Sequence, residues 1–164
     1  MAVLTTIALI IFIVEAQIPL PVPIPGVKLG LANVVTLFAL FSGQTKKHDS
    51  VELNMVDAFM ILVCRIILGA VFTGRVIAFA YSIAGGVLGF AAQAVMKRYV
   101  TNKQIWVCSA IGAIFHNIGQ IIAAIVITET PAIAAYLPTL IIAGIVTGVV
   151  TGLIAQITIE RVKT

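Results

Sequence analysis

Long apolar segments dominate this chain and restrict it to a membrane fold. Of its 164 residues, 61% are hydrophobic and only 10% are charged, whereas charged residues make up roughly a quarter of a soluble domain. Six segments approach the roughly 17 to 25 mostly apolar residues that a helix needs to cross a bilayer. They are residues 2–18, 27–41, 56–72, 75–96, 104–128 and 132–159. The sequence therefore predicts an all-α integral membrane protein, a compact bundle of six transmembrane helices in one domain, 1–164.

Basic residues between the segments predict the orientation of the bundle, because Lys and Arg concentrate in cytoplasmic loops. They follow the second, fourth and sixth segments, and these positions lie on one side if every segment crosses the membrane. The residues are Lys46, Lys47, His48, Lys97, Arg98, Lys103, Arg161 and Lys163. We therefore expect cytoplasmic N- and C-termini and a Pro-rich outer loop between the first two helices. Topology also accounts for the net charge of +4, so nothing in it indicates a nucleic-acid partner.

A proline at every second position from Pro19 to Pro25 marks the loop between the first two segments. Each proline fixes its own φ angle, removes a backbone donor and favours an extended residue before it, so we expect a stiff polyproline-like strap. Irregular backbone at membrane depth is tolerated only where it is buried in protein or lines a cavity. The strap alone fits an ordinary connecting loop as well as the outer wall of a binding site.

Polar side chains inside the apolar segments share a depth between the middle and the outer end of the bundle. A charged group near the bilayer centre costs at least roughly 2.5–3.5 kcal/mol, so each one needs a partner or a cavity. In the fifth segment, Gly112, His116 and Gln120 recur at four-residue spacing and therefore share a helix face. The candidate substrate-binding residues are Glu15, Gln17, Lys28, Asn33, Arg65, Arg75, His116, Asn117 and Gln120. We expect them to line a pocket that opens to the outside under the strap, residues 19–26.

The charge of this set favours a ligand with an anionic group, because cations exceed anions in it and Arg binds carboxylates and phosphates well. Other roles stay open for individual residues. Arg65 could form a structural ion pair with Glu15 or Glu129, and His116 could be a helix-packing residue. Lys28 and Arg75 could reach the lipid headgroups. The shared depth of the set favours a binding site.

Other motifs bear on packing and on catalysis. Gly144, Gly148 and Gly152 form a smooth helix face, which fits close packing inside the bundle or docking to a separate membrane subunit. The chain has no GxxxxGK[ST] loop for nucleotide phosphates and no acidic cluster for magnesium. Cys64 and Cys108 lie in apolar runs away from any zinc-binding pattern. The sequence therefore predicts a protein that is not an enzyme and holds no metal or other cofactor.

The block Pro25-Gly-Val-Lys-Leu-Gly-Leu-Ala-Asn33, followed by Val34-Val-Thr-Leu37, resembles the Gx transporter family. Arg65 and the pair His116-Asn117 support the resemblance, which extends over nearly the whole chain. Members of this family are also named heptaprenyl diphosphate synthase component I. The family is similar to the substrate-binding S components of energy-coupling factor transporters, which bind a vitamin or precursor from outside.

The resemblance implies a multi-pass protein of a prokaryotic cell membrane that binds a small anionic or amphipathic, isoprenoid-related precursor. It also implies a transmembrane coupling subunit and ATPase subunits as partners. S components commonly dock through small residues spaced four apart in the first helix. Here Phe12 interrupts Ala8 and Ala16, so the glycine face of the sixth segment is a possible substitute. The alternative function is a non-catalytic membrane anchor for isoprenoid diphosphate synthesis or for flavin-linked extracellular electron transfer.

Overall fold

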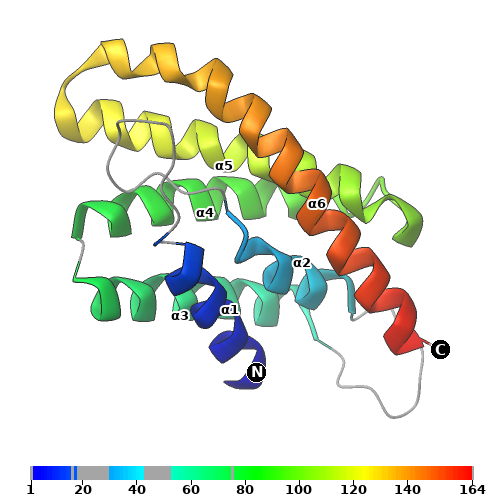
Figure 1. Ribbon diagram of the computed structural model, residues 1–164. Coiled ribbons are helices and arrows are strands. Elements are labelled where there is room, and N and C mark those ends of the chain that lie inside the picture. Colours follow the sequence, from blue (N-terminus) through cyan, green and yellow to red (C-terminus); the bar gives the residue numbers. More distant parts are fainter. Residues whose placement is uncertain (1, 16, 18–29, 43–52, 75, 164) are drawn as a thin grey trace.

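Helices form almost all of the computed structural model, which describes residues 2–15, 17, 30–42, 53–74 and 76–163. This part of the chain contains no β-strand. The α-helices are α1 (Ala2–Glu15), α2 (Asn33–Ser42), α3 (Met55–Thr73), α4 (Val76–Met96), α5 (Ile105–Thr128) and α6 (Leu137–Lys163), and short 3₁₀ helices η1 (Asn102–Gln104) and η2 (Pro131–Tyr136) precede α5 and α6 (Figure 1). The prediction of an all-α fold with six helices is confirmed.

Four of these helices are long and apolar enough to cross a membrane, so the chain has the architecture of a multi-pass membrane protein. They are α3, α4, α5 and the continuous unit Pro131–Arg161 formed by η2 and most of α6. By contrast, α1 has 14 residues and α2 has 10, which correspond to about 21 and 15 Å at 1.5 Å per residue. The prediction of six helices of spanning length is thus confirmed for four of them.

The second helix is shorter than predicted because its start is displaced from residue 27 to Asn33. Gly30 has a φ angle of +81°, a left-handed conformation that glycine adopts without the steric cost of a Cβ atom. A turn over residues 31–32 then leads into α2. The Pro strap, together with Lys28 and Arg75, lies outside the described residues, and the cytoplasmic placement of the termini stays a prediction.

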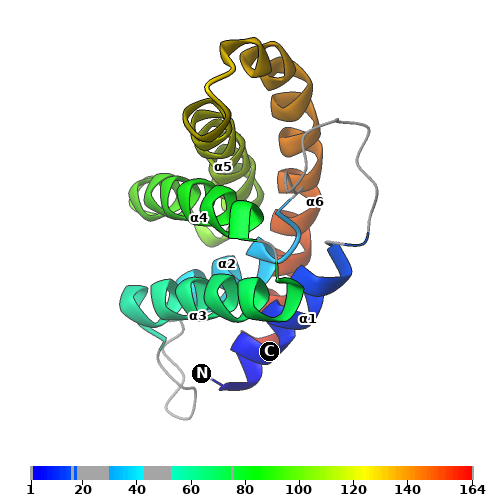
Figure 2. The same ribbon diagram turned by 90° about the vertical axis from the view of Figure 1, so that its left-hand side faces the viewer.

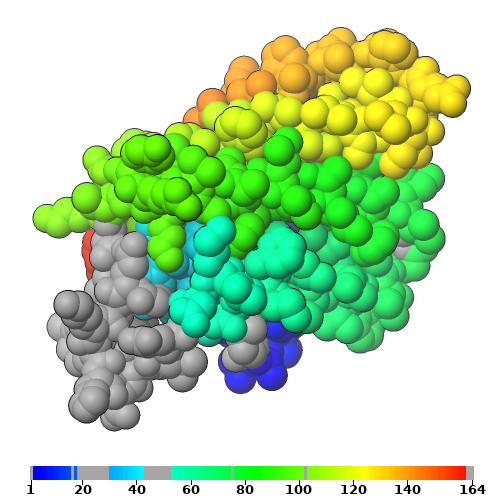
Figure 3. All heavy atoms as spheres, turned by 180° about the vertical axis from the view of Figure 1, so that it is seen from behind, coloured from blue at the N-terminus to red at the C-terminus, as the bar shows by residue number. Residues whose placement is uncertain are grey.

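The helices are arranged in two groups of three. Helices α4, α5 and α6 pack side by side, while α1, α2 and α3 form a second group (Figure 2). Contacts between α2 and α6 and between α3 and α4 join the groups. From behind, α3 and α4 lie next to each other and cover much of this face (Figure 3). The two groups therefore meet along a seam that runs through the molecule.

The short helix α2 lies at the centre of the apolar core. Seven of its ten residues are buried, and Leu37, Leu40 and Phe41 are fully enclosed. An isolated helix of this length is marginally stable, so α2 depends on packing against α3 and α6. Ala8 of α1 is also fully buried and belongs to the same core.

The glycine face of α6 packs against α5 within the chain. A Cβ atom at Gly148 would lie 2.7 Å from Ala110 Cα, and Cβ atoms at Gly144 and Gly152 would overlap Asn117 and Trp106. Small residues allow helix backbones to approach this closely. A partner could reach this face only if α5 and α6 separated.

A hydrogen bond between side chains spans the same interface. The hydroxyl groups of Ser109 and Thr151 lie 3.0 Å apart, and the Thr151 hydroxyl also donates to the Gly148 carbonyl at 3.1 Å. The contact between α5 and α6 therefore combines close backbone approach with a buried polar pair.

Candidate functional site

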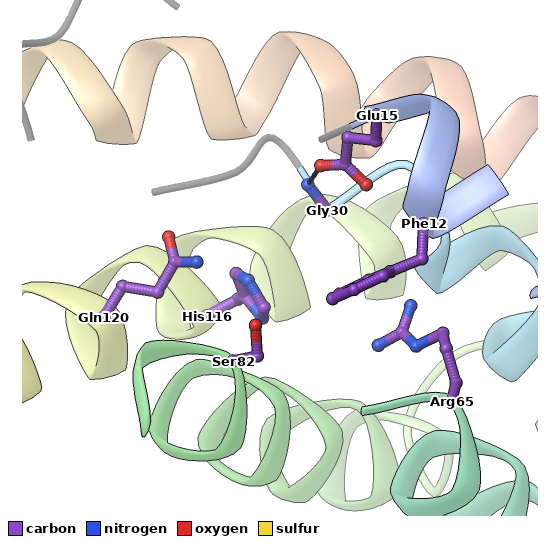
Figure 4. Close-up of a pocket in the computed structure, with 7 residues that line it drawn as sticks. All are labelled: Phe12, Glu15, Gly30, Arg65, Ser82, His116 and Gln120. Atoms are coloured by element: carbon purple, nitrogen blue, oxygen red, sulfur yellow. Dashed lines mark hydrogen bonds between the residues drawn. The ribbon is translucent and has the colours of Figure 1, made fainter. Parts of the chain in front are cut away.

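A small polar cavity lies on the seam between the two groups of helices (Figure 4). Its lining comes from five parts of the chain, namely Phe12 and Glu15 of α1, Gly30 before α2, Arg65 of α3, Ser82 of α4, and His116 and Gln120 of α5. The cavity measures about 10 Å³, which is room for about one water molecule. The group of α1, α2 and α3 contributes the charged side chains, Glu15 and Arg65. The group of α4, α5 and α6 contributes the polar side chains of Ser82, His116 and Gln120.

The cavity lies near the middle of the long helices. At 1.5 Å per residue, Arg65 is about 12 Å from the C-terminal end of α3, and His116 is about 18 Å from the C-terminal end of α5. Charged groups at such a position in a membrane are costly, and they commonly mark a pathway or a binding site.

Glu15, the last residue of α1, connects this helix to the start of α2. Its side chain is buried, and one carboxylate oxygen accepts a hydrogen bond from the Gly30 N–H. The other oxygen accepts from the Ala32 N–H at 3.3 Å. The first amides of a helix lack partners within the helix and carry partial positive charge, so they attract anions. The Glu15 carboxylate thus occupies a favourable anion position.

Arg65 approaches the cavity from α3 and is only 3% exposed. Its guanidinium carbon lies 5.8 Å from the centroid of the Phe12 ring, a distance typical of a cation–π contact. Its Nε atom has no hydrogen-bond partner within the described part of the chain. Glu15 attracts the guanidinium electrostatically, while its two oxygens are bound to the backbone amides of Gly30 and Ala32.

Gln120 lies on the α5 face that meets α4 and is fully buried. The close approach depends on Gly85, where a Cβ atom would lie 2.8 Å from Gln120 Cγ and 2.7 Å from the His116 carbonyl oxygen. Both the oxygen and the nitrogen of the Gln120 amide lack partners among the described residues. A buried amide without hydrogen bonds is costly, so this site offers both a donor and an acceptor to a bound molecule.

The structure brings together four of the nine predicted site residues, Glu15, Arg65, His116 and Gln120. Asn33 is buried at the first position of α2 but does not line the cavity, and Gln17 is exposed. Asn117 donates a hydrogen bond to the Leu140 carbonyl and so connects α5 to α6. Its side chain leaves the helix on a different face because successive residues rotate by about 100°. Lys28 and Arg75 lie outside the described residues.

Three lining residues were absent from the predicted set. Phe12 contributes the ring beside Arg65, Gly30 contributes a backbone amide, and Ser82 contributes a hydroxyl on the α4 side. The available signals were weak, since an apolar Phe and a Ser among small residues are common in membrane helices. Of the three, only Gly30 lies in a segment that the sequence analysis had singled out, the block from Pro25 to Asn33.

A larger apolar groove lies between α1, α2 and α6 and measures about 270 Å³. Its walls are almost entirely aliphatic or aromatic and consist of Leu4, Ile7, Ile11, Val34, Val35, Phe38, Ile154, Ala155 and Thr158. Such a lining suits a hydrocarbon chain and offers little to a charged group.

Lys97, directly after α4, is a charged group outside the spanning segments. Partial burial lowers the pKa of its ammonium group, and its Nζ atom lies 6.0 Å from the centroid of the Phe41 ring. Among the described residues, no group of three or more His, Cys, Asp or Glu side chains could hold a metal ion.

Comparison with protein families identifies the relatives of this chain. The model of the family described as heptaprenyl diphosphate synthase component I matches residues 4–158. The chain belongs to this family. Searches of curated proteins and of solved structures found no significant match. The family's description names one component of a synthase, which implies at least one further component.

Proposed function

We propose that this member of the heptaprenyl diphosphate synthase component I family is a membrane substrate-binding subunit, similar to the S components of energy-coupling factor uptake transporters. Its ligand is a small anionic or amphipathic precursor, with an isoprenoid-related compound as the class that the family suggests. The observation that carries the proposal is the buried polar cavity, where the Arg65 Nε atom and both polar atoms of the Gln120 amide lack partners among the described residues.

The energetic cost of these groups supports a binding role. Native proteins satisfy the large majority of their buried polar groups, so each exception calls for an explanation such as a missing ligand or water. The cavity gathers such groups in one place, at mid-depth, with contributions from both groups of helices. A ligand with an anionic group and a hydrogen-bonding group would satisfy Arg65 and Gln120 together.

The apolar groove supports an amphipathic ligand. It is formed by α1, α2 and α6, and α1 and the start of α2 also contribute to the polar cavity. The hydrocarbon part of a ligand could therefore lie in the apolar groove beside α1 and α2, while its polar head binds in the cavity next to the same two elements.

We also propose a transmembrane coupling subunit and ATPase subunits as partners, because the sequence lacks a nucleotide-phosphate loop and uptake requires energy. Ala8 and the glycine face of α6 are buried in contacts within the chain. A partner that docks on them would have to rearrange α1 or α6, so the outer surfaces of these helices are the more accessible contact area.

A second candidate function is a non-catalytic membrane subunit of a prenyl diphosphate synthase. The observation that favours it is the family's description as a component of such a synthase. In this role the protein would hold a catalytic component at the membrane, and the polar cavity would contribute to stability or to contact with a prenyl product.

Mass spectrometry of small molecules that remain bound to the protein distinguishes the two functions. The protein is isolated from native membranes in lipid nanodiscs, as wild type, as Arg65→Ala and as the control Arg98→Ala, which removes an exposed arginine. We expect a discrete anionic compound with the wild type and the control but not with Arg65→Ala. Only bulk lipids in all three samples, together with a stoichiometric synthase component, would instead support the second function.

A further inference from the structure

The start of α2 is an anion site that already has an occupant from the same chain. The Gly30 and Ala32 amides donate to the two oxygens of the Glu15 carboxylate. The helix that follows is ten residues long, so its dipole adds positive potential at this end. A carboxylate or phosphate oxygen of a ligand would make the same contacts as the Glu15 side chain makes.

Two further side chains that line the same cavity, Arg65 and Gln120, have buried polar atoms that form no hydrogen bond with Glu15. Arg65 is 3% exposed, its Nε atom lacks a partner in the described residues, and its guanidinium faces the cavity (Figure 4). Gln120 is fully buried, and neither the donor nor the acceptor of its amide has a partner in the part of the chain that the structure describes. Glu15 accepts from the amides before α2, while the Arg65 Nε atom and the Gln120 amide have no hydrogen-bond partner among the described residues.

We propose that Glu15 is an internal substitute for the ligand and that a small oxyanion, a carboxylate or a phosphate, binds by displacing it. This inference rests on the proposed function and changes the expected role of Glu15 from a ligand contact to a competitor. The oxyanion accepts hydrogen bonds from the Gly30 and Ala32 amides, and Arg65 provides the opposite charge. Gln120 then pairs with a second polar group of the ligand.

The size of the cavity supports displacement over simple addition. With Glu15 in place, the space of about 10 Å³ holds about one water molecule and is too small for a carboxylate or phosphate group. Two anions beside each other in this buried setting would also repel strongly. When the Glu15 carboxylate leaves, it frees both the amides and the volume of its own group, and it releases the connection between the end of α1 and the start of α2.

Equilibrium binding to the Glu15→Gln variant tests this inference. The glutamine has nearly the same shape but no charge, and neutral hydrogen bonds are roughly half as strong as charge-assisted ones, so it competes less well for the amides. Glu129→Gln is the matched control, because it removes an exposed acid just after α5. The probes are radiolabelled inorganic phosphate and acetate as soluble oxyanions, and geranyl phosphate as a lipid-like one, with each protein in nanodiscs.

We expect Glu15→Gln to bind at least one probe at least about tenfold more tightly than the wild type, which corresponds to about 1.4 kcal/mol. The Glu129→Gln control should match the wild type. Tighter binding of phosphate and acetate would indicate a soluble ligand, and tighter binding of geranyl phosphate alone would indicate a lipid-like one. Glu15→Ala is a second variant that removes the competing acceptor completely, and it should also bind the probe more tightly than the wild type.

The outcomes separate this inference from the proposed function. If the wild type binds a probe and Glu15→Gln or Glu15→Ala binds it equally or more weakly while still folded, Glu15 is a ligand contact and the inference is wrong. If neither the wild type nor the variants bind any probe, and no small molecule accompanies the protein from native membranes, both the inference and the proposed function are contradicted. Thermal unfolding of each variant identifies a loss of binding that is due to a loss of structure.

Discussion

Replacing Arg65 by methionine tests whether this buried charge serves binding or the fold. The side chain is 3% exposed, and its Nε atom lacks a partner among the described residues. Removing a charge from the centre of a membrane helix relieves about 2.5–3.5 kcal/mol on insertion scales. Losing the contact with the Phe12 ring costs about 0.5–2 kcal/mol. We therefore expect Arg65→Met to stabilise the protein by about 0.5–3 kcal/mol and to abolish ligand binding.

Thermal unfolding followed by circular dichroism in one fixed lipid or detergent environment measures this change. Each kcal/mol corresponds to about 2–4 °C in a chain of this size, so the melting temperature should rise by several degrees. Arg98→Met is the control, since this arginine is exposed, and it should change stability by no more than about 0.5 kcal/mol.

The opposite result would refute the reasoning. If Arg65 were a structural partner of Glu15, removing it would leave an uncompensated buried carboxylate and destabilise the protein by about 3–5 kcal/mol. A marked fall in melting temperature for Arg65→Met, with Arg98→Met unchanged, would therefore assign Arg65 to the fold.

Three further substitutions test packing, backbone conformation and the buried amide. Gly148→Leu places a side chain where even a Cβ atom would lie 2.7 Å from Ala110 Cα; we expect a loss of about 1–3 kcal/mol or more, and an unchanged melting temperature would show that α5 and α6 are not closely packed. Gly30→Ala forces a Cβ atom onto a φ angle of +81° and should cost about 1–2 kcal/mol in thermal unfolding, whereas a neutral effect would contradict this backbone conformation. Gln120→Leu removes the unpartnered amide, so calorimetric binding of the identified ligand should weaken at least about tenfold while stability is kept or increased. Unchanged affinity would remove Gln120 from the site.

Three of the four long helices could be predicted from the sequence almost to the residue, whereas α6 (Leu137–Lys163) starts five residues later and ends four residues later than the predicted segment 132–159. The segment 56–72 became α3 (Met55–Thr73), and 104–128 became α5 (Ile105–Thr128). These boundaries follow from local chemistry, because an apolar run of spanning length ends where polar residues or glycine begin.

The start of α2 and the composition of the site could not be predicted in the same way. The conformation of Gly30 is linked to the hydrogen bond that its N–H donates to the carboxylate of Glu15, fifteen residues earlier, and local patterns carry no information about such a contact. Asn117 shares the depth of His116, yet a rotation of one residue on α5 turns it toward Leu140. The expected depth in the membrane pointed to Glu15 and Arg65, which line the cavity, but the direction of each side chain depends on how the helices pack.

Electron cryomicroscopy of the protein isolated from its native membranes, bound to a rigid antibody fragment, tests the central claim most directly. The account predicts density for a small non-protein molecule between the two groups of helices, within hydrogen-bonding distance of the Arg65 guanidinium and the Gln120 amide. It also predicts that the Glu15 carboxylate has left the Gly30 and Ala32 amides. The account would be contradicted if the ligand were bound elsewhere on the protein, while the cavity contained only water and Glu15 still accepted hydrogen bonds from these amides.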